Sequence, residues 1–413
     1  NRALLERIRG AEDYAFHGLV PSEKVEEPEH YRIGEILSEA ESQLEGFPGT
    51  VDAIVGYIDI PVGAILPILC GCYGLPGPTL ESVLRCQHKF WARLLQARAV
   101  PEHVPRFALI DPFAADPAAG LDLDFPFWLK PVKSAGSYLG FRIGSRRQLR
   151  RKLAVIRDNI ERLAEPFDYL VRLAGVHQGP DALDFTHCIA EEIIGGRQCT
   201  LEGYVHRGEV HVYGAVDSIR HRNRATFLRY EYPSRLPQGV RERMTAVVER
   251  ALAGTGLEES PFNAELFWDR PRDRIWLLEI NTRISQSHSD LFHLVDGSSN
   301  HQVMVELGLG RKPAMPHREG RYSCAAKFFL RAYRDAVVEA VPSPADIARV
   351  QEAFPGSRVK LNVRPGTRLS QLREQDSYSY DLGWVFLGAD TARKLRENCQ
   401  RAAAMLPFRL SPV

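Results

Sequence analysis

The chain has 413 residues, more than one ordinary hydrophobic core accommodates, so two or three domains are expected. Its 44% hydrophobic and 25% charged residues are typical of a water-soluble globular protein, and a net charge of +1 supplies no overall field for nucleic acid or a membrane surface. No run approaches the roughly 18 apolar residues that a membrane-spanning helix requires.

The seven cysteines form an odd set without a C-x-x-C pair, and most stand in apolar or helical surroundings. They are Cys70, Cys72, Cys86, Cys188, Cys199, Cys324 and Cys399. Buried, reduced thiols of this kind are typical of cytosolic proteins, so a cytoplasmic location is expected. The chain opens at Asn1, without a methionine or a secretory segment, and we expect that some N-terminal residues are missing.

The first 80 residues alternate between strand-like and helix-like patterns. Apolar runs predict strands at 12–20 and 51–58, whereas helical periodicity predicts helices at 31–44 and 61–73. Such alternation is typical of a parallel α/β sheet.

A loop of small residues follows a predicted helix at 81–97, which carries Lys89, and predicted strands at 104–109 and 125–130. The second of these strands ends in a lysine. Backbone N–H groups of small residues approach phosphate oxygens closely, and a nearby lysine neutralises their charge. The candidate phosphate-binding residues are therefore Lys130, Ser134, Gly136 and Ser137. The order differs from a Walker A loop, and an ordinary turn beside a solvated lysine is the competing interpretation.

Several shorter elements follow this loop. We expect strands at 141–143, 169–173 and 187–194, helices at 148–162 and 240–254, and a hairpin of 200–205 with 209–217. Two acids and then glycines end one of these strands, where Glu191 and Gln198 are placed to hydrogen-bond an adenine amino group and ribose hydroxyls. An exposed linker with ordinary surface charges is the alternative.

Arginines and aromatic residues interleave at 218–233. Arg220 and Arg229 are placed there to grip phosphate or carboxylate, which a planar guanidinium binds well, and one or the other would add positive charge beside a developing oxyanion. Interleaved arginine and tyrosine also occur in nucleic-acid sites, but one short stretch in a chain without overall basic charge argues against that. A solvated loop is the alternative.

The most specific pattern is a predicted antiparallel hairpin that spans 262–283. Its turn places Glu265 opposite Glu279, with about 5 Å between cross-strand partners. Asn281 and Arg283 share the face of Glu279, because strand side chains repeat with period two. Two carboxylates and an amide oxygen at the end of an apolar hairpin call for a cation, and Mg²⁺ prefers such oxygen ligands together with phosphates. Ordinary surface charges are the alternative, although the second strand is apolar on both faces.

The residues just beyond the hairpin, Ser287 and His288, are expected to border a substrate pocket, although a lone histidine is more often structural. We expect helices at 300–309 and 391–406 and strands at 323–330 and 358–363 in the remainder of the chain.

Taken in order, these segments resemble the ATP-grasp superfamily of ATP-dependent carboxylate–amine ligases, whose members include D-alanine–D-alanine ligase, biotin carboxylase and L-amino-acid ligases. The matching motifs are His88-Lys89, Trp128-Leu-Lys130-Pro131, Ser134 to Ser137, Ala190 to Ile194 with Gln198, Asn263-Ala-Glu265 and Glu279-Ile-Asn281-Thr-Arg283. They cover about residues 50–310. Many relatives have proline where this chain has Thr282, and glutamate at the position of Gln198.

The resemblance implies an α/β architecture, α+β in part, with the ATP-grasp fold. Its domains would be an N-terminal Rossmann-like α/β domain at 1–80, an ATP-grasp core at 81–310 with a mobile lid at about 120–192, and a C-terminal α+β domain at 311–413.

The resemblance also implies roles for individual residues. The ATP contacts would be those of Lys89, Lys130, Glu191, Ile194 and Gln198. Two Mg²⁺ ions, for which Mn²⁺ can substitute, would be ligated by Glu265, Glu279 and Asn281. Arg283 would face the transferred phosphoryl group or the acyl phosphate.

The expected activity is ATP-dependent joining of a carboxylate to an amine through an acyl phosphate, giving an amide or peptide bond, ADP and phosphate. Small molecules, amino acids above all, are the expected substrates, with no nucleic-acid or membrane partner, and a homodimer would be common among similar proteins. Two alternatives stay open. One is a phosphotransferase or carboxylase on the same nucleotide site, and the other is a regulatory protein that binds nucleotide without turnover.

Overall fold

The computed structural model describes residues 2–26, 28–134, 138–173, 175, 185–221, 226–373 and 375–413. Within these ranges every strand pair is antiparallel, and the strands form an eight-stranded, a four-stranded and a two-stranded sheet. No helix in the described ranges is long and apolar enough to cross a bilayer.

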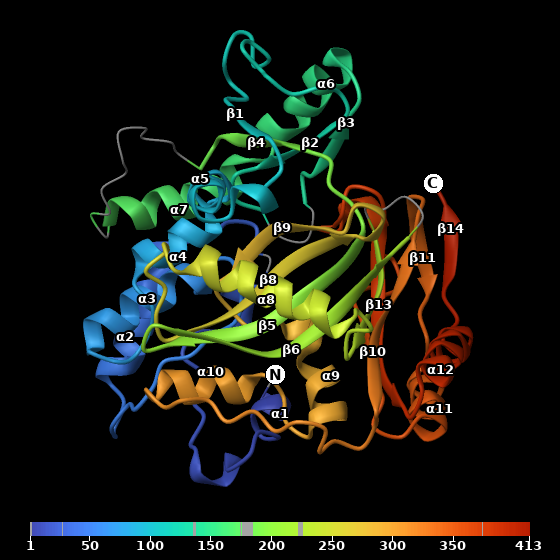
Figure 1. Ribbon diagram of the computed structural model, residues 1–413. Coiled ribbons are helices and arrows are strands. Elements are labelled where there is room, and N and C mark those ends of the chain that lie inside the picture. Colours follow the sequence, from blue (N-terminus) through green and yellow to red (C-terminus); the bar gives the residue numbers. More distant parts are fainter. Residues whose placement is uncertain are drawn as a thin grey trace.

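The eight-stranded sheet is the framework of the molecule, with the strand order β12-β13-β10-β7-β6-β5-β8-β9 (Figure 1). Its strands are β5 (Arg197–His206), β6 (Glu209–Arg220), β7 (Phe227–Tyr232), β8 (Ser260–Asp269), β9 (Arg274–Asn281), β10 (Cys324–Ala332), β12 (Arg358–Leu361) and β13 (Tyr380–Ala389). The hairpin of β5 with β6 and the hairpin of β8 with β9 confirm two predictions from the sequence.

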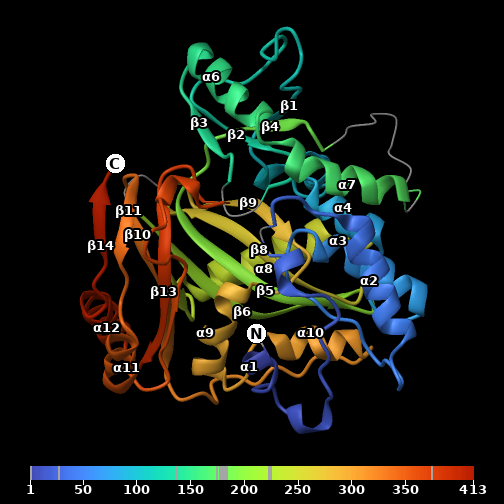
Figure 2. The same cartoon turned by 180° about the vertical axis from the view of Figure 1, so that it is seen from behind.

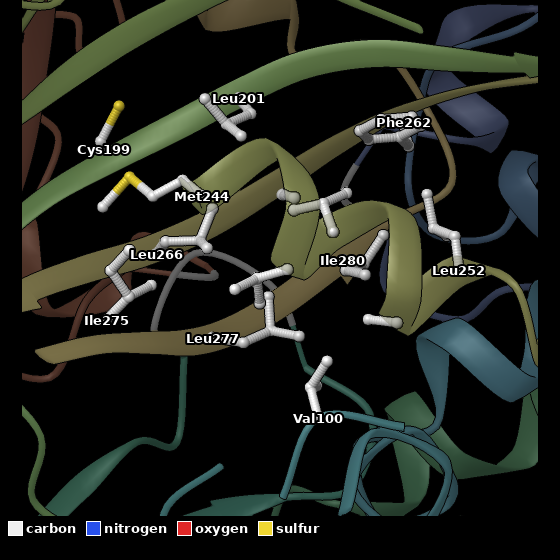
Figure 3. Close-up of a cluster of buried hydrophobic side chains, with 14 of the residues drawn as sticks. Val100, Cys199, Leu201, Met244, Leu252, Phe262, Leu266, Ile275, Leu277 and Ile280 are labelled. Carbon is white, nitrogen blue, oxygen red and sulfur yellow. The ribbon is translucent and has the colours of Figure 1, made fainter. Parts of the chain in front are cut away.

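Helices cover both faces of this sheet. Helix α8 (Gln238–Leu252) packs on one face with Leu266 and Leu277, which are fully buried (Figure 3). Burying each such leucine contributes roughly 1.5–3 kcal/mol. Helix α10 (His301–Gly308) packs against Tyr204 on the opposite face, as α9 (Gln286–Asp296) does against β7, β10 and β13 (Figure 2). Because strand side chains alternate, neighbouring residues of β5 serve the two layers.

The four-stranded sheet lies above the large one in Figure 1, with the strand order β1-β4-β2-β3. Its strands are β1 (Phe107–Ile110), β2 (Phe127–Pro131), β3 (Phe141–Ile143) and β4 (Cys188–Glu192), and α6 (Arg146–Arg157) packs on it. The expected strand at 169–173 is wrong, because these residues end helix α7 (Glu161–Leu173). Its apolar side packs into the N-terminal helices, which imposes helical rather than strand periodicity.

The described N-terminal residues contain helices and connecting segments but no strand, so the expected parallel sheet is wrong. The helices are α1 (Arg2–Leu5), α2 (Ile33–Glu45), α3 (Val62–Tyr73), α4 (Leu80–Gln87) and α5 (Lys89–Ala99). No strand precedes Phe107 in the described residues, so the strands expected at 12–20 and 51–58 do not form. Segment 51–58 runs extended along α10, where Val55 lies beside Gly308, and has no strand neighbour to complete a ladder.

The helix expected at 81–97 is two helices that meet at His88. The backbone of His88 is extended, with ψ 103°, and its Nδ1 accepts a hydrogen bond from Trp91 N at 3.2 Å, which caps the start of α5. This break aims Lys89 at the site described below.

The C-terminal part adds a third layer beside the end of the large sheet (Figure 1). It contains α11 (Pro344–Ala353), α12 (Ala392–Ala404) and the pair β11 (Ala336–Ala340) with β14 (Arg409–Pro412). Strand β10, strand β12 and helix α12 confirm the elements expected at 323–330, 358–363 and 391–406. The sequence did not reveal α9, α11, β11, β13 and β14, nor that β7 is a strand within the segment interpreted as a loop.

Candidate functional site

A cavity of about 2600 Å³ lies where the two larger sheets and the N-terminal region meet. Strands β2 and β4 of the small sheet supply Lys130 and Glu191, and the large sheet supplies Glu265 and Glu279. The extended segment before α3 supplies Asp59. Residues far apart in the sequence therefore line one continuous space.

The acidic hairpin has the geometry that the sequence predicts. Glu265 of β8 stands directly opposite Glu279 of β9, and Asn263 stands opposite Asn281. Asn281 donates from Nδ2 to Asn263 Oδ1 at 3.1 Å, which leaves its own carbonyl oxygen as the ligating atom. All of these residues line the cavity.

The pKa values of Glu265 and Glu279 show that positive charge is needed to keep both carboxylates ionised. Burial and the neighbouring Glu279 raise the pKa of Glu265 to about 7. Burial also opposes ionisation of Glu279, but the charges of Lys89 and Lys130 outweigh it and lower the pKa of that group. A divalent cation between the carboxylates would favour the ionised form of both. The described residues hold no cluster of three His, Cys, Asp or Glu side chains that suits a metal, and Asn281 is the amide oxygen donor that lies beside the two carboxylates.

Two lysines, Lys89 and Lys130, lie near Glu279 of the acidic pair. Lys89 Nζ lies 3.3 Å from Glu279 Oε2 and donates to the carbonyl oxygen of Ser134 at 2.9 Å. Lys89 thus joins the start of α5, strand β9 and the small-residue loop. Ser134 lines the cavity, whereas the predicted phosphate contacts Gly136 and Ser137 lie outside the described residues.

Glu191 is the centre of a buried ion-pair network that the sequence revealed only in part. Its Oε2 lies 2.6 Å from Lys130 Nζ, and its Oε1 accepts from Arg93 Nε at 2.5 Å. Arg93 also donates from Nη2 to the carbonyl oxygen of Leu278 at 2.6 Å. Although burial alone would raise it, Arg93 and Lys130 lower the pKa of Glu191 to about 2. Both carboxylate oxygens are therefore occupied by cations.

Gln198 connects the hairpin to the arginine-rich segment. Its Nε2 donates to Glu265 Oε2 at 2.6 Å, and its Oε1 accepts from Arg220 Nε. The Arg220 guanidinium also lies 4.0 Å from the centre of the Phe227 ring. Gln198 and Ile194, which were predicted to contact nucleotide, and Arg220, which was predicted to be catalytic, all line the cavity.

Arg229 is a correction, because its position does not support a catalytic role. The side chain pairs with Glu231 at 2.6 Å between Nε and Oε1, and both charges influence Cys399 of α12. Neither residue lines the cavity. Arg220 and Arg229 lie on strands with a register irregularity between them, and the alternation of β7 turns Arg229 away from the cavity.

Arg283 is held by Asp59, an acid that no sequence pattern singles out. Its Nη2 donates to Asp59 Oδ2 at 2.9 Å, while Asp59 Oδ1 accepts from Lys133 Nζ at 2.6 Å. Burial alone would raise it, but the charges of Lys133 and Arg283 lower the pKa of Asp59. Lys133 follows the predicted phosphate-binding strand in sequence, which was the available signal for it.

The first turn of α9 forms another wall of the cavity. Ser287 Oγ accepts a hydrogen bond from Lys327 Nζ at 2.9 Å, and His288 Nδ1 lies 2.7 Å from Glu202 Oε1. Ser287, His288 and Lys327 line the cavity. The structure therefore brings both predicted substrate-binding residues to the same cavity as the acidic hairpin.

A row of cavity-lining residues crosses the eight-stranded sheet from β10 to β5. Strand register pairs Lys327 with Tyr230, Tyr230 with Ser218, and Ser218 with Gln198. Three strand spacings separate the ends of this row, which corresponds to about 14 Å along the sheet.

Comparison with known proteins gives this fold its relatives. Residues 123–289 match the family described as ATP-grasp domain. "Uncharacterized protein y4rH" of Sinorhizobium fredii (strain NBRC 101917 / NGR234) is 28% identical over 358 residues, which are 83% of this chain. The chain spans 65% of the length of that relative, slightly less than two thirds.

Two solved structures illustrate the likeness in three dimensions. An L-amino acid ligase from Bacillus licheniformis superposes with a TM-score of 0.70 at 17% identity, covering 91% of this chain and 85% of that one. A biotin carboxylase–β-γ-ATP complex from Campylobacter jejuni superposes with a TM-score of 0.58 at 17% identity, covering 92% and 80%. At such identities the likeness establishes the fold alone.

Proposed function

The chain contains an ATP-grasp domain within an ATP-grasp fold, and on this premise we propose that it is an ATP-dependent ligase. It would join a carboxylate to an amine through an acyl phosphate, and release ADP and phosphate. Amino acids are the proposed substrates, because the L-amino acid ligase of Bacillus licheniformis has the higher TM-score of the two structures compared.

The observation that carries the proposal is the oxygen cluster of Glu265, Glu279 and Asn281, with Lys89 and Lys130 beside it. Carboxylate and amide oxygens are the ligands of Mg²⁺, which usually completes its shell with water and substrate phosphates. When bound, magnesium would supply positive charge to the transferring phosphoryl group.

The residues of the chain would act by holding charge in place. Lys89 and Lys130 would neutralise phosphate oxygens, and Gln198 would keep Glu265 aimed at the metal. Arg283, fixed by Asp59, would face the phosphoryl group as it moves to the substrate carboxylate. Positioning and electrostatic stabilisation account for most catalysis of phosphoryl transfer, so this set requires no nucleophile from the protein.

The remaining assignments extend this picture. We propose that the four-stranded sheet covers the nucleotide, since an acyl phosphate hydrolyses when water reaches it. Residues 1–80, 81–310 and 311–413 would serve as the N-terminal, ATP-grasp and C-terminal domains. The buried thiols, of which Cys86 and Cys199 have their pKa raised to about 12 by burial, fit a reducing cytoplasm.

The test is ADP release with Mg²⁺ and ATP across all pairs of the twenty proteinogenic amino acids, with peptide products identified by mass. We expect turnover that needs both a carboxylate and an amine, and a loss of at least about 100-fold in the Glu279→Gln variant. Glu352→Gln, an exposed position on α11, is the matched control and should retain full turnover.

Other results would point elsewhere. Stable phosphorylation of a single substrate would identify a phosphotransferase instead. Tight ATP binding without ADP under any pairing would refute turnover, and full activity of Glu279→Gln would refute the metal site.

A further inference from the structure

We propose that the cavity ends in an acceptor subsite for an amine that itself carries a carboxylate, in which Lys327 binds the carboxylate and His288 accepts a proton from the amine. This inference rests on the proposed function and deepens it. It identifies the amine substrate as an α-amino acid, or a close analogue with a free acid group, and not as a simple amine.

Lys327 is a buried cation with no carboxylate partner in the described part of the chain. Its residue exposure is 3%, and no carboxylate oxygen of the described residues lies within 4 Å of Nζ. Nζ donates to Ser287 Oγ at 2.9 Å and lies 3.6 Å from the centre of the Trp384 ring and 4.7 Å from that of Phe329. A buried ammonium normally has a charged partner, so its place on a cavity wall points to an anion from the ligand.

The charges around Lys327 favour an anion as well. Burial lowers its pKa to about 7, and the like charges of Lys360 and Arg331 add to this effect, although Asp381 and Asp290 oppose it. Arg331 is already paired with Asp376 at 3.0 Å. Lys360 Nζ lies 4.8 Å from the centre of the Trp384 ring and lines the cavity, so it adds positive charge to the subsite. A bound carboxylate would raise the pKa of Lys327 towards its ordinary range.

His288 has the surroundings of a proton acceptor. Glu202, whose side chain is fully buried, binds its Nδ1 at 2.7 Å and also accepts from Tyr213 Oη at 3.2 Å and from Ser285 N at 3.4 Å. Because the carboxylate only accepts, the histidine proton resides on Nδ1, and Nε2 carries the free lone pair. Within the described residues Nε2 has no hydrogen-bond partner, and His288 lines the cavity.

Two sets of contacts link Lys327 to His288. Ser287, which receives the hydrogen bond from Lys327, is the sequence neighbour of His288. The ring of Tyr230, the cross-strand partner of Lys327, stands 5.0 Å from the ring of His288. An α-amino acid places its nitrogen and its carboxylate at such neighbouring positions.

Strand register also links the proposed subsite to the acidic hairpin. Glu202 is the cross-strand partner of Asn263, which in turn pairs with the proposed metal ligand Asn281. Asn281, Glu202 with its bound His288, and Lys327 thus follow one another across the sheet. An acyl phosphate formed at the metal would have its carbon facing the amine held at His288.

The proton and bond changes balance without another reactant. The ammonium of the acceptor gives one proton to His288 Nε2, and Glu202 stabilises the imidazolium that forms. The neutral amine then forms a bond to the acyl carbon, the bond from that carbon to the phosphate oxygen breaks, and the departing phosphate takes the second amine proton. His288 returns its proton to solvent.

The first experiment needs no variant. Amide formation by the wild-type protein is measured with free amino acids as acceptors and with the corresponding amino-acid amides, which keep the amine but lack the carboxylate. Hydroxylamine, a neutral nucleophile, separately traps the acyl phosphate as a hydroxamate. We expect kcat/KM to be about 50-fold or more higher for the free acids. Equal values for acids and amides would overturn the inference, whereas the absence of any hydroxamate would instead overturn the proposed function.

The second experiment replaces Lys327 with methionine, which keeps the length of the side chain. The ratio of amide to hydroxamate formation should fall about 50-fold, mainly through KM of the acceptor, and the preference for acids over amides should disappear. Lys312→Met, at an exposed position, is the control and should keep both. An unchanged KM and an unchanged preference in a folded Lys327→Met variant would refute the role of Lys327.

The role of His288 is tested by the pH dependence of amide formation. The titratable and charged groups that face it are Glu202 from β5, Tyr213 from β6, Tyr230 from β7 and, through Ser287, Lys327 from β10. His288→Gln should lower amide formation about 100-fold relative to hydroxamate formation, and should remove the fall in rate on acidification that we expect for the wild-type protein. A variant that keeps the wild-type rate and pH profile would show that His288 accepts no proton.

Discussion

Replacing Arg93 with methionine should destabilise the protein by about 3 kcal/mol, because it leaves the buried carboxylate of Glu191 with a single cation. Arg93 binds Glu191 Oε1 at 2.5 Å and the carbonyl oxygen of Leu278 at 2.6 Å. One guanidinium therefore ties α5 to a strand of the small sheet and to the strand that carries the proposed metal ligands. The side chains of Arg93 and Glu191 are only 3% and 5% exposed, so solvent screens their interaction little.

The magnitude follows from the titration of Glu191. Arg93 and Lys130 overcome the effect of burial and lower its pKa from 4.5 to about 2, and each pKa unit corresponds to about 1.4 kcal/mol. The pair of cations thus contributes about 3 kcal/mol through this one carboxylate. Lys130 still pairs with Glu191 in the variant, which makes the loss of stability smaller. The carbonyl oxygens bound by Arg93 lose their donor, which makes the loss larger by a similar amount.

The measurement is urea denaturation of the wild-type, Arg93→Met, Glu191→Gln and doubly substituted proteins. Because the folded pKa of Glu191 is lowered, the stabilisation is present above the unfolded pKa and is lost as pH falls towards the folded value. The difference between wild type and Arg93→Met should therefore be full at pH 7 and should shrink below about pH 5. The double variant should be more stable than the sum of the single effects implies.

Arg98→Met, an exposed position on the same helix, provides the control for helix propensity and should change stability by less than about 0.5 kcal/mol. Additive single effects, or a difference for Arg93→Met that does not depend on pH, would refute the assignment of this energy to the ion pair.

Two further predictions concern the frame of the site. Asp59→Asn should lower the rate of ADP release at least about 10-fold and the stability by about 3 kcal/mol, since it leaves buried Lys133 and half-buried Arg283 without their counter-charge. Wild-type values in enzyme assay and thermal denaturation would contradict this. Gly196→Ala should weaken ATP binding and stability by about 2 kcal/mol or more, because its φ is +129° and a Cβ would lie 2.3 Å from the carbonyl oxygen of Trp268. Gly239→Ala, where a Cβ meets nothing within 4 Å, is the control in calorimetry, and equal effects of the two would refute the clash.

The acidic hairpin could be predicted because everything that defines it is local in sequence. Period-two alternation and one turn predict the pairing of Glu265 with Glu279, and in the structure a bulge between Glu265 and Leu266 brings the two carboxylates opposite each other. The same holds for the hairpin of β5 with β6. The N-terminal strands failed for the opposite reason. An apolar run such as 51–58 becomes a strand only if a partner strand lies beside it, and here helices fill that place.

The positioning groups of the site could not be found in this way. Arg93 and Glu191 are 98 residues apart, and Asp59 and Arg283 are 224 apart, so no spacing rule links them. Lys327 lies in a predicted strand, but its proposed role depends on burial among aromatic rings that are distant in sequence, and this could not be predicted.

The hydrogen-bonded strands at the floor of the cavity fix the distance between the proposed nucleotide end and the proposed acceptor end. The interval from Gln198 to Lys327 is set by whole strands and not by adjustable side chains. The distance between the two ends can change only by adding or removing a whole strand, so a longer or shorter pair of reactants cannot be accommodated by a small shift of either end. Diversification of such a scaffold should therefore exchange the chemistry of individual positions along the row, such as Tyr230, while the length of the reactants it accepts stays constant.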